Sequence, residues 1–199
     1  MRTVRVVGLV LLTQLLATTA GLGQRRARGI YLNAGSLTTV ADLNAAGTDF
    51  LSGGLYVGAG VSWQPIAVDS SLTVLGNVTW IRHTLHTSQA GSGANVDAFF
   101  YGLDLDYIYY ARRRFAFTLA GGGGAVVLHV WDTTGVSRAR PYARLGLGAR
   151  YAATKRLQYF LQTFGIVYDL RNFPATSVLG PYHRRQSDVG IGLGVALRL

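Results

Sequence analysis

Acidic and basic side chains recur two residues apart in apolar stretches of this sequence. Asp104 and Asp106 are separated by one residue, as are Arg138 and Arg140. Residues two apart in a β-strand point to the same face. Unpaired charges on an enclosed face are unfavourable, so we expect an ion-pair network there. Its expected members are Asp104, Asp106, Arg140, Arg144, Arg150, Asp188 and Arg198.

Position along the expected strands decides which of these charges can meet. Asp188 is expected at the height of Arg140, and the other two aspartates deeper, near Arg144 and Arg150. The network would plug a narrow lumen. The alternative is a narrow, porin-like ion path, whose excess of arginine would favour anions.

The histidines offer little for catalysis. His83 and His86 could approach a metal ion, but two imidazoles without a third ligand make a weak site, and we expect surface histidines. His86, Thr87 and Ser88 resemble the His-x-Ser pair of outer-membrane lipid A deacylases, yet the chain contains no glutamate to orient the histidine. We therefore expect no enzyme, no cofactor and no metal.

Composition excludes several classes of protein. The 199 residues include 26 glycines, 4 prolines and no cysteine, so disulfides and thiolate metal sites are excluded. The absence of glutamate and the single lysine disfavour a helical protein. The net charge is +10, but the arginines are spread along the chain rather than gathered on one basic face, and we expect no direct nucleic-acid binding.

Alternation of apolar and small or polar residues predicts β-strands. In the last strand, Val189, Ile191 and Leu193 alternate with Gly190 and Gly192. The glycine run at residues 121–124 is expected to form a bend or bulge, and a thin wall against which a partner or lipid packs is the alternative. The eight expected strands cover residues 29–36, 52–64, 71–82, 97–110, 114–130, 138–151, 156–169 and 188–199.

Long and short connections alternate along the chain. The connections at 37–51, 84–95 and 171–185 are long and that at 132–137 is intermediate, whereas those at 65–70, 111–113 and 152–155 are short. An even number of antiparallel strands with this layout predicts an all-β, up-and-down, eight-stranded antiparallel transmembrane β-barrel, with both termini at the short-turn end.

A soluble barrel of the lipocalin or avidin type is the alternative, and the glycines disfavour it. Glycine weakens a solvent-exposed strand face, whereas it helps side chains to pack inside a narrow barrel. Aromatic residues also gather near both ends of the expected strands, as at two membrane interfaces. They are Trp63, Tyr109, Phe115, Tyr151 and Tyr159 at one end and Trp80, Phe99 and Trp131 at the other.

The first residues are typical of an export signal. Arg2 and Arg5 precede an apolar run that is too short to span a bilayer, and small residues follow it. We predict a helical signal peptide at residues 1–23 and a barrel domain at residues 24–199; a retained membrane anchor is the alternative.

The C-terminal residues resemble the assembly signal of small outer-membrane β-barrel proteins, the OmpA/OmpX-like barrels. The signal residues are Gly194, Leu197 and Leu199, with leucine standing where such families usually end in Phe or Trp. The resemblance implies a monomeric barrel in the cell outer membrane of a diderm bacterium, contacting outer-membrane lipids, lipopolysaccharide and the insertion machinery. It also implies a structural or interaction role through extracellular loops.

Two basic segments could serve contacts outside the barrel. The loop containing Phe173, Tyr182, Arg184 and Arg185 is a candidate surface for lipopolysaccharide or a partner protein. The triplet Arg112, Arg113 and Arg114 is expected to be a solvated turn, with contact to lipid phosphates as the alternative.

A second resemblance concerns the TraO family of conjugative-transposon outer-membrane proteins. Mature TraO proteins begin with a pattern similar to Gln24-Arg25, Gly29 and residues 33–37 (Asn-Ala-Gly-Ser-Leu) of this chain. They end with a pattern similar to residues 189–193. This resemblance implies a component of a conjugation apparatus that acts with conjugation proteins. A lipid-modifying barrel enzyme is the other alternative.

Overall fold

The computed structural model of the chain describes residues 28–40, 50–64, 71–86, 95–131, 137–170 and 185–199. The predicted signal peptide lies outside them. No helix among these residues is long and apolar enough to cross a membrane. The strands are β1 (Arg28–Thr39), β2 (Phe50–Ser52), β3 (Leu55–Trp63), β4 (Leu72–His86), β5 (Asn95–Arg112), β6 (Phe115–Val130), β7 (Ser137–Ala152), β8 (Leu157–Asp169) and β9 (Arg185–Arg198).

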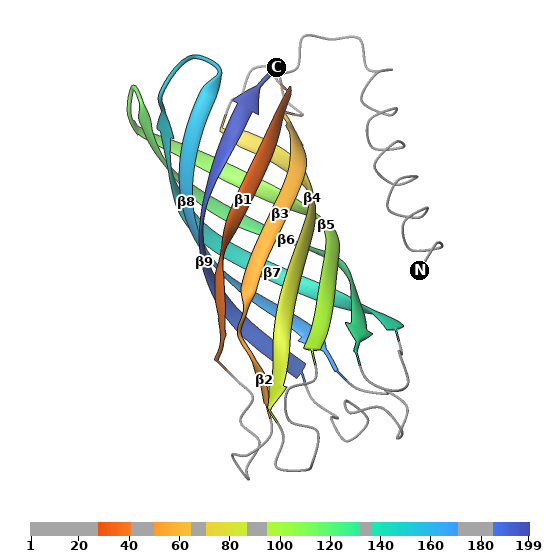
Figure 1. Ribbon diagram of the computed structural model, residues 1–199. Helices are drawn as coiled ribbons and strands as arrows, with labels where there is room; N and C mark the ends of the chain where they lie inside the picture. Colours follow the sequence, from red (N-terminus) through yellow and green to blue (C-terminus); the bar gives the residue numbers. More distant parts are fainter. Residues whose placement is uncertain (1–27, 41–49, 65–70, 87–94, 132–136, 171–184) are drawn as a thin grey trace, which may run out of the picture.

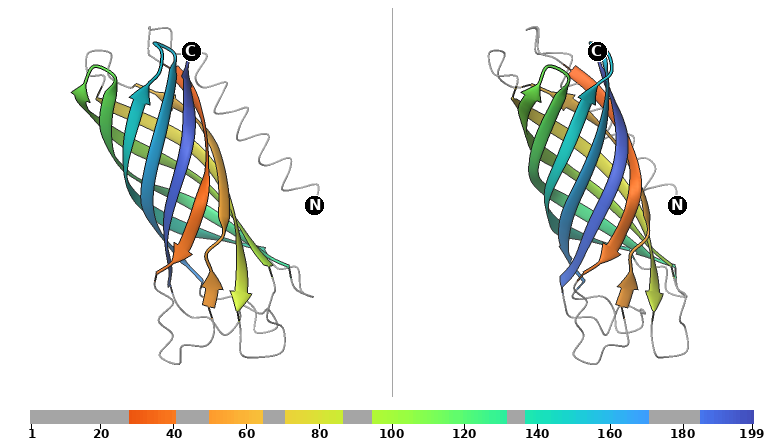
Figure 2. Two further views of the ribbon diagram at one scale, coloured as in Figure 1. Left: turned by 60° about the vertical axis from the view of Figure 1, so that its left-hand side comes forward. Right: turned by 90° about the vertical axis from the view of Figure 1, so that its left-hand side faces the viewer.

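The strands close into one ring of antiparallel neighbours (Figures 1 and 2). From β3 onward each strand pairs with the next along the chain, β9 pairs with β1, and β1 pairs with β3. β2 and β3 both pair with β4, at residues 84–86 and 74–81, so they form one interrupted strand of the wall. The predicted all-β, up-and-down, eight-stranded antiparallel barrel is therefore confirmed.

The two ends of the barrel differ. At one end, here called the turn end, β5 joins β6 through residues 113–114 and β7 joins β8 through residues 153–156. The start of β1 and the C-terminus also lie at this end, at the top of Figure 1. The opposite end is called the loop end.

The barrel wall is taller at the loop end than the sequence pattern predicts. β1 continues to Thr39 rather than to residue 36, and β4 continues to His86 rather than to residue 82. β9 begins at Arg185 instead of residue 188. The reason is ladder pairing, which joins polar residues such as Thr39 to Asp188 and so continues the strands past the end of the apolar alternation.

Side chains alternate between the outer surface and the lumen. On β7, Leu145 and Leu147 are 64% and 59% exposed, whereas Tyr142 on the other face is buried. The structure therefore places the predicted apolar rows outside. The exposed apolar side chains include Ile30, Leu32, Leu55, Val57, Leu103, Leu105, Leu161, Ile191, Leu193, Val195 and Leu197.

The glycines of β9 make room for aromatic rings in the lumen. A Cβ atom at Gly190 would meet the ring of Phe164, and one at Gly194 would meet the ring of Phe160. A Cβ atom at Gly192 would overlap the hydroxyl of Tyr56. Large rings from β3 and β8 thus fill the space that β9 leaves free, so glycine in this row serves packing.

The glycine run of β6 forms no β-bulge. Gly121 to Gly124 pair in continuous register with β5 and with β7, so a bulge is excluded there. A Cβ atom at Gly122 would clash with the side chain of Asp104 and with the carbonyl oxygen of Leu103. The glycine is required by the close approach of that carboxylate.

Two adjacent glycines provide a test of this packing. We expect Gly122→Ala to lower the free energy of unfolding by about 1–3 kcal/mol because the added methyl group overpacks the lumen. Gly121→Ala should not destabilise the barrel, because its Cβ would lie 3.8 Å from Leu145 Cδ1, an ordinary contact. Urea unfolding in lipid vesicles, followed by tryptophan fluorescence, measures both. Equal losses in the two variants would contradict the account.

Candidate functional site in the barrel lumen

The loop-end half of the lumen is filled by a hydrophobic core. Phe100 packs edge to face against Tyr142 and Tyr168, with ring centroids 5.1 and 5.4 Å apart. Tyr56 and Phe164 form a similar pair at 5.3 Å. We call this group the lumen core; its other buried members include Leu37, Leu51, Ile81, Val96, Ala98, Val126, Leu128, Val130, Ile166 and Leu170.

The lumen core corrects the expectation of a polar lumen. Inward positions near the loop end carry residues such as Phe100, Val126 and Ile166, and all three are at least 97% buried. Apolar residues occupy both faces of the strands there, so alternation gives no signal. Because these side chains interdigitate across the barrel, the loop-end half is packed like a protein interior.

A polar cluster lies beside the lumen core. The Tyr168 hydroxyl donates to Asp188 at 3.1 Å and lies 3.1 Å from His83 Nε2. Gln186 Nε2 donates to Asp188 Oδ1 at 2.7 Å, and the Thr39 hydroxyl lies 2.9 Å from the same oxygen. His83 is fully buried, so its prediction as a surface histidine is wrong. It faces inward because β4 continues beyond residue 82.

The turn-end half of the lumen is charged. Arg144 Nη1 lies 3.5 Å from Asp104 Oδ2, and Arg150 forms an ion pair with Asp106. Asn77 Nδ2 also donates to Asp104 Oδ2, at 3.1 Å. These pairs join strands β5 and β7 across the lumen, because β6, which separates them in the wall, contributes only small side chains at this height.

A small cavity lies among these charges. Its volume is about 40 Å³, and it is lined by Asn33, Asp104, Asp106 and Arg144 together with neighbouring residues. Four buried atoms on these side chains have no hydrogen-bond partner among the residues that the structure describes: Asn33 Oδ1, Asp104 Oδ1, Asp106 Oδ1 and Arg144 Nε. Three of these atoms are acceptors and one is a donor, and water can both donate to the first three and accept from the fourth. At roughly 15 Å³ for each water molecule, the cavity has room for two or three.

A second cavity connects the charged half with the turn end. Its volume is about 70 Å³, and it shares Ser62 and Arg150 with the first cavity. It also touches Gln158 and Arg198, which lie near the ends of their strands. The lumen is therefore polar toward the turn end and apolar toward the loop end. No group of three or more His, Asp, Glu or Cys side chains in the described strands could hold a metal ion.

The structure divides the expected ion-pair network into separate parts. Arg144 and Arg150 meet Asp104 and Asp106, whereas Asp188 receives hydrogen bonds from Tyr168 and Gln186. Arg140 Nη1 donates to the Ala139 carbonyl at 3.2 Å. Arg198 is exposed at the turn end.

The remaining predicted residues lie on or beyond the strands. Arg185 is exposed at the start of β9, while Phe173, Tyr182 and Arg184 lie outside the described residues. Of the expected assembly signal, Gly194 faces the lumen, and Leu197 and Leu199 are 46% and 71% exposed.

A charged cluster on the outer surface was missed by the sequence analysis. Arg82 donates to both carboxylate oxygens of Asp97, at 2.9 and 3.2 Å, and lies 5.2 Å from the ring centroid of Trp80. Trp131 Nε1 donates to Asp97 at 2.7 Å. The strand positions of Arg82 and Asp97 are cross-strand neighbours, a relation that becomes visible only once the β4–β5 register is known.

Known proteins resemble the chain in structure but not in sequence. No family model and no curated protein matches it. Neisserial surface protein A superposes with a TM-score of 0.58 at 11% identity, over 87% of this chain and 99% of that one. A major outer membrane protein from Thermus thermophilus superposes with a TM-score of 0.55 at 12% identity, over 88% of this chain and 100% of that one. Ail, the attachment invasion locus protein of Yersinia pestis, superposes with a TM-score of 0.53 at 10% identity, over 88% of this chain and 100% of that one.

The chain has the fold of the small outer-membrane β-barrels. The OmpA/OmpX-like resemblance read from the sequence is thus confirmed at the level of fold. The TraO resemblance still rests on the short sequence stretches alone. In an outer-membrane-type barrel of eight strands the interior is just wide enough for side chains, which agrees with the packed lumen of this chain.

The buried ion pairs of this outer-membrane-type barrel predict a stability pattern. We expect Asp104→Leu to lower the free energy of unfolding by about 3–5 kcal/mol, because Arg144 is left without its counter-charge in the lumen. The double variant Asp104→Leu/Arg144→Met should lose much less, since no charge is then stranded.

The matched control is Arg138→Met at the loop end. That side chain is exposed, so its loss should change the free energy of unfolding by at most about 1 kcal/mol. Urea titration in vesicles compares the three variants with the parent. A double variant that is no more stable than Asp104→Leu would contradict the buried pairing.

Proposed function

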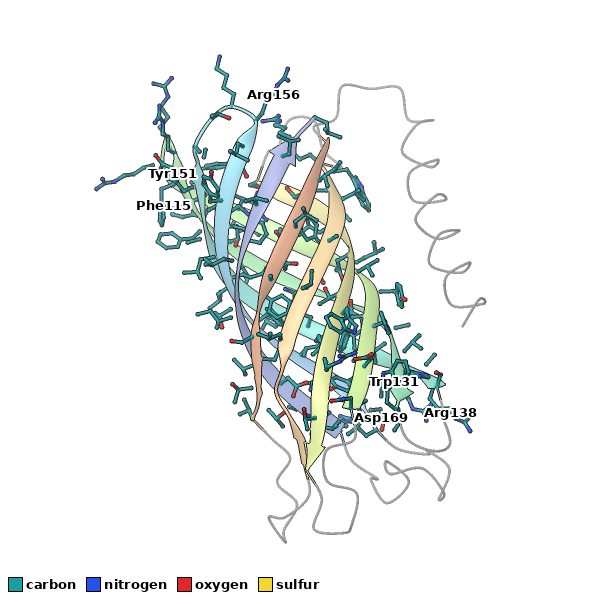
Figure 3. The ribbon with its side chains drawn as sticks, in the orientation of Figure 1. Phe115, Trp131, Arg138, Tyr151, Arg156 and Asp169 are labelled. Atoms are coloured by element: carbon teal, nitrogen blue, oxygen red, sulfur yellow. The ribbon has the colours of Figure 1, made fainter. Side chains whose placement is uncertain are left out.

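We propose that this chain is an integral outer-membrane protein of a diderm bacterium. Support comes from the rows of exposed apolar side chains around a closed barrel, since an apolar surface of this extent needs lipid or another partner to cover it. Exposed aromatic residues at both ends are what two membrane interfaces require. In Figure 3, Phe115 and Tyr151 lie at the turn end and Trp131 lies at the loop end.

The proposed role is structural or interactive rather than transport. The observation that carries this proposal is the lumen core, in which Phe100, Tyr56 and Tyr168 are almost completely buried. Packed aromatic rings in the lumen leave little space for a solute to pass. The loop end is then the surface at which the proposed interactions with external partners take place. The full closure of the ring also leaves no strand edge for pairing with a second chain, which supports a monomer.

The proposed interaction surface lies at the loop end. Arg185 and Arg138 are exposed there, and Trp131, which follows β6 at the same end, is 49% exposed. Phe173, Tyr182 and Arg184 precede Arg185 in the chain and complete the proposed surface. Arginine with aromatic side chains suits lipopolysaccharide phosphates or a partner protein.

An enzymatic role has weaker support. His129 Nδ1 lies 2.7 Å from Ser137 Oγ on the outer surface, which is the distance of a nucleophile and its base. The neighbouring carboxylate of Asp97, however, is held by Arg82 and Trp131. Asp97 is therefore not available to orient His129 as a catalytic base, and a lipid-modifying activity has little support. No contact among the described strands supports a role in conjugation.

Conductance in planar lipid bilayers tests the closed lumen. We expect the parent protein to insert without steady current, because the lumen core blocks the path at the loop end. Phe100→Ala/Tyr168→Ala removes two rings that contact each other, with centroids 5.4 Å apart, and should open a measurable conductance.

The matched control removes an aromatic side chain from the outer surface instead. Phe117 is 51% exposed, so Phe117→Ala should stay silent. Faster migration of unheated samples on an SDS gel verifies that each variant has formed its barrel. Steady current through the parent protein would overturn the proposed role and favour an ion path.

A further inference from the structure

A large apolar groove lies on the outer surface near the turn end. Its volume is about 760 Å³, and it is an open hollow on the outer wall rather than an enclosed cavity. Its wall includes Phe115, Tyr151 and Tyr159, which are direct cross-strand neighbours on β6, β7 and β8. Ala149 and Leu161 continue the wall toward the middle of the barrel.

Exposed cations stand at the turn end of the groove. Arg114 directly precedes Phe115, and Arg156 lies three residues before Tyr159. Figure 3 shows Arg156 at the same end of the barrel as Phe115 and Tyr151. The exposed basic residues of this end are Arg112, Arg113, Arg114, Lys155, Arg156 and Arg198.

Backbone hydrogen bonds hold these cationic turns beside one another. Ala152 N donates to the Arg114 carbonyl at 2.8 Å, which joins the β5–β6 turn to the β7–β8 turn. Arg198 N donates to the Arg156 carbonyl at 2.7 Å. Within the β7–β8 turn, the Thr154 hydroxyl accepts from the backbone N–H of Arg156 and Leu157, at 3.2 and 2.9 Å. The side chains of Arg114 and Arg156 take no part in these bonds.

No acidic side chain among the described residues balances this group. Asp106 is the described acid nearest to this end along β5, six residues before Arg112, and it is buried in the lumen in an ion pair with Arg150. The groove therefore combines an apolar wall with an excess of positive charge at one end.

We propose that this groove binds an anionic phospholipid, with the phosphate at Arg114 and Arg156 and an acyl chain along Phe115, Tyr151 and Tyr159. The positive charge favours a lipid as the occupant, because a cationic edge attracts a phosphate. A second copy of this chain would carry the same positive charge and would be repelled. Arginine also binds phosphate oxygens with two parallel N–H donors. The proposal rests on the membrane location argued above and adds a lipid class to it.

Lipid retention measured by native mass spectrometry tests this proposal. The barrel is reconstituted in an equimolar mixture of dioleoylphosphatidylglycerol and dioleoylphosphatidylcholine and then transferred to a mild detergent. One cation near an anionic lipid surface favours binding by about fivefold, so we expect the parent protein to retain the glycerol lipid in about fivefold or greater excess. Arg114→Gln/Arg156→Gln should lower this ratio severalfold.

Matched variants separate the contributions of charge and shape. Arg82→Gln removes a positive charge on the outer surface toward the loop end, outside both proposed binding surfaces, and should leave the ratio unchanged. Arg114→Lys/Arg156→Lys keeps the charge and should keep most of the preference. Ala149→Phe fills the groove without changing charge and should lower the amount of retained glycerol lipid.

Three results would overturn the proposal. They are equal retention of both lipids by the parent protein, an undiminished preference in Arg114→Gln/Arg156→Gln, and an equal loss in the loop-end control. Incorporation into the membrane is read separately, from extraction and from migration of unheated samples. A barrel that inserts but retains both lipids equally would therefore refute the lipid site and leave the proposed function standing.

Discussion

Closure of the strand ring is the constraint on which the rest of the structure depends. The ladder between β1 and β9 leaves no unpaired strand edge, and in hydrocarbon each unpaired backbone group would be unfavourable by several kcal/mol. A ring of eight strands encloses a space only as wide as packed side chains. The outer rows are then free to be apolar, and the inner rows must fill a fixed volume without leaving charges unpaired.

The lumen meets this constraint in two different ways. Toward the loop end, rings such as Phe100 and Phe164 fill the space, and the glycines of β9 make room for them. Toward the turn end, Arg144 and Arg150 neutralise Asp104 and Asp106, beside a cavity suited to water. The packing along the lumen therefore changes from ion pairs at the turn end to apolar rings at the loop end.

Period-two alternation made most of the fold predictable, because an apolar outer face and a small or polar inner face repeat along β7 and β9. The same alternation placed Asp104, Asp106, Arg144 and Arg150 on the inner face. It could not reveal the lumen core, because both faces are apolar around Phe100 and Val126. His83 and the Arg82–Asp97 pair were missed for a different reason: they depend on strand ends and register, which backbone pairing extends beyond the apolar pattern.

The central claim is that successive residues face lipid and lumen in turn, and the chain contains no cysteine, so single labels can test it. Gln158 and Tyr159 are neighbours on β8; the first lines the turn-end cavity, and the second is 49% exposed outside. A fluorophore on Tyr159→Cys in vesicles should be quenched by doxyl-labelled lipid and protected from aqueous iodide, and one on Gln158→Cys should show the reverse. Equal quenching of both sites by iodide would contradict the barrel's placement in a membrane.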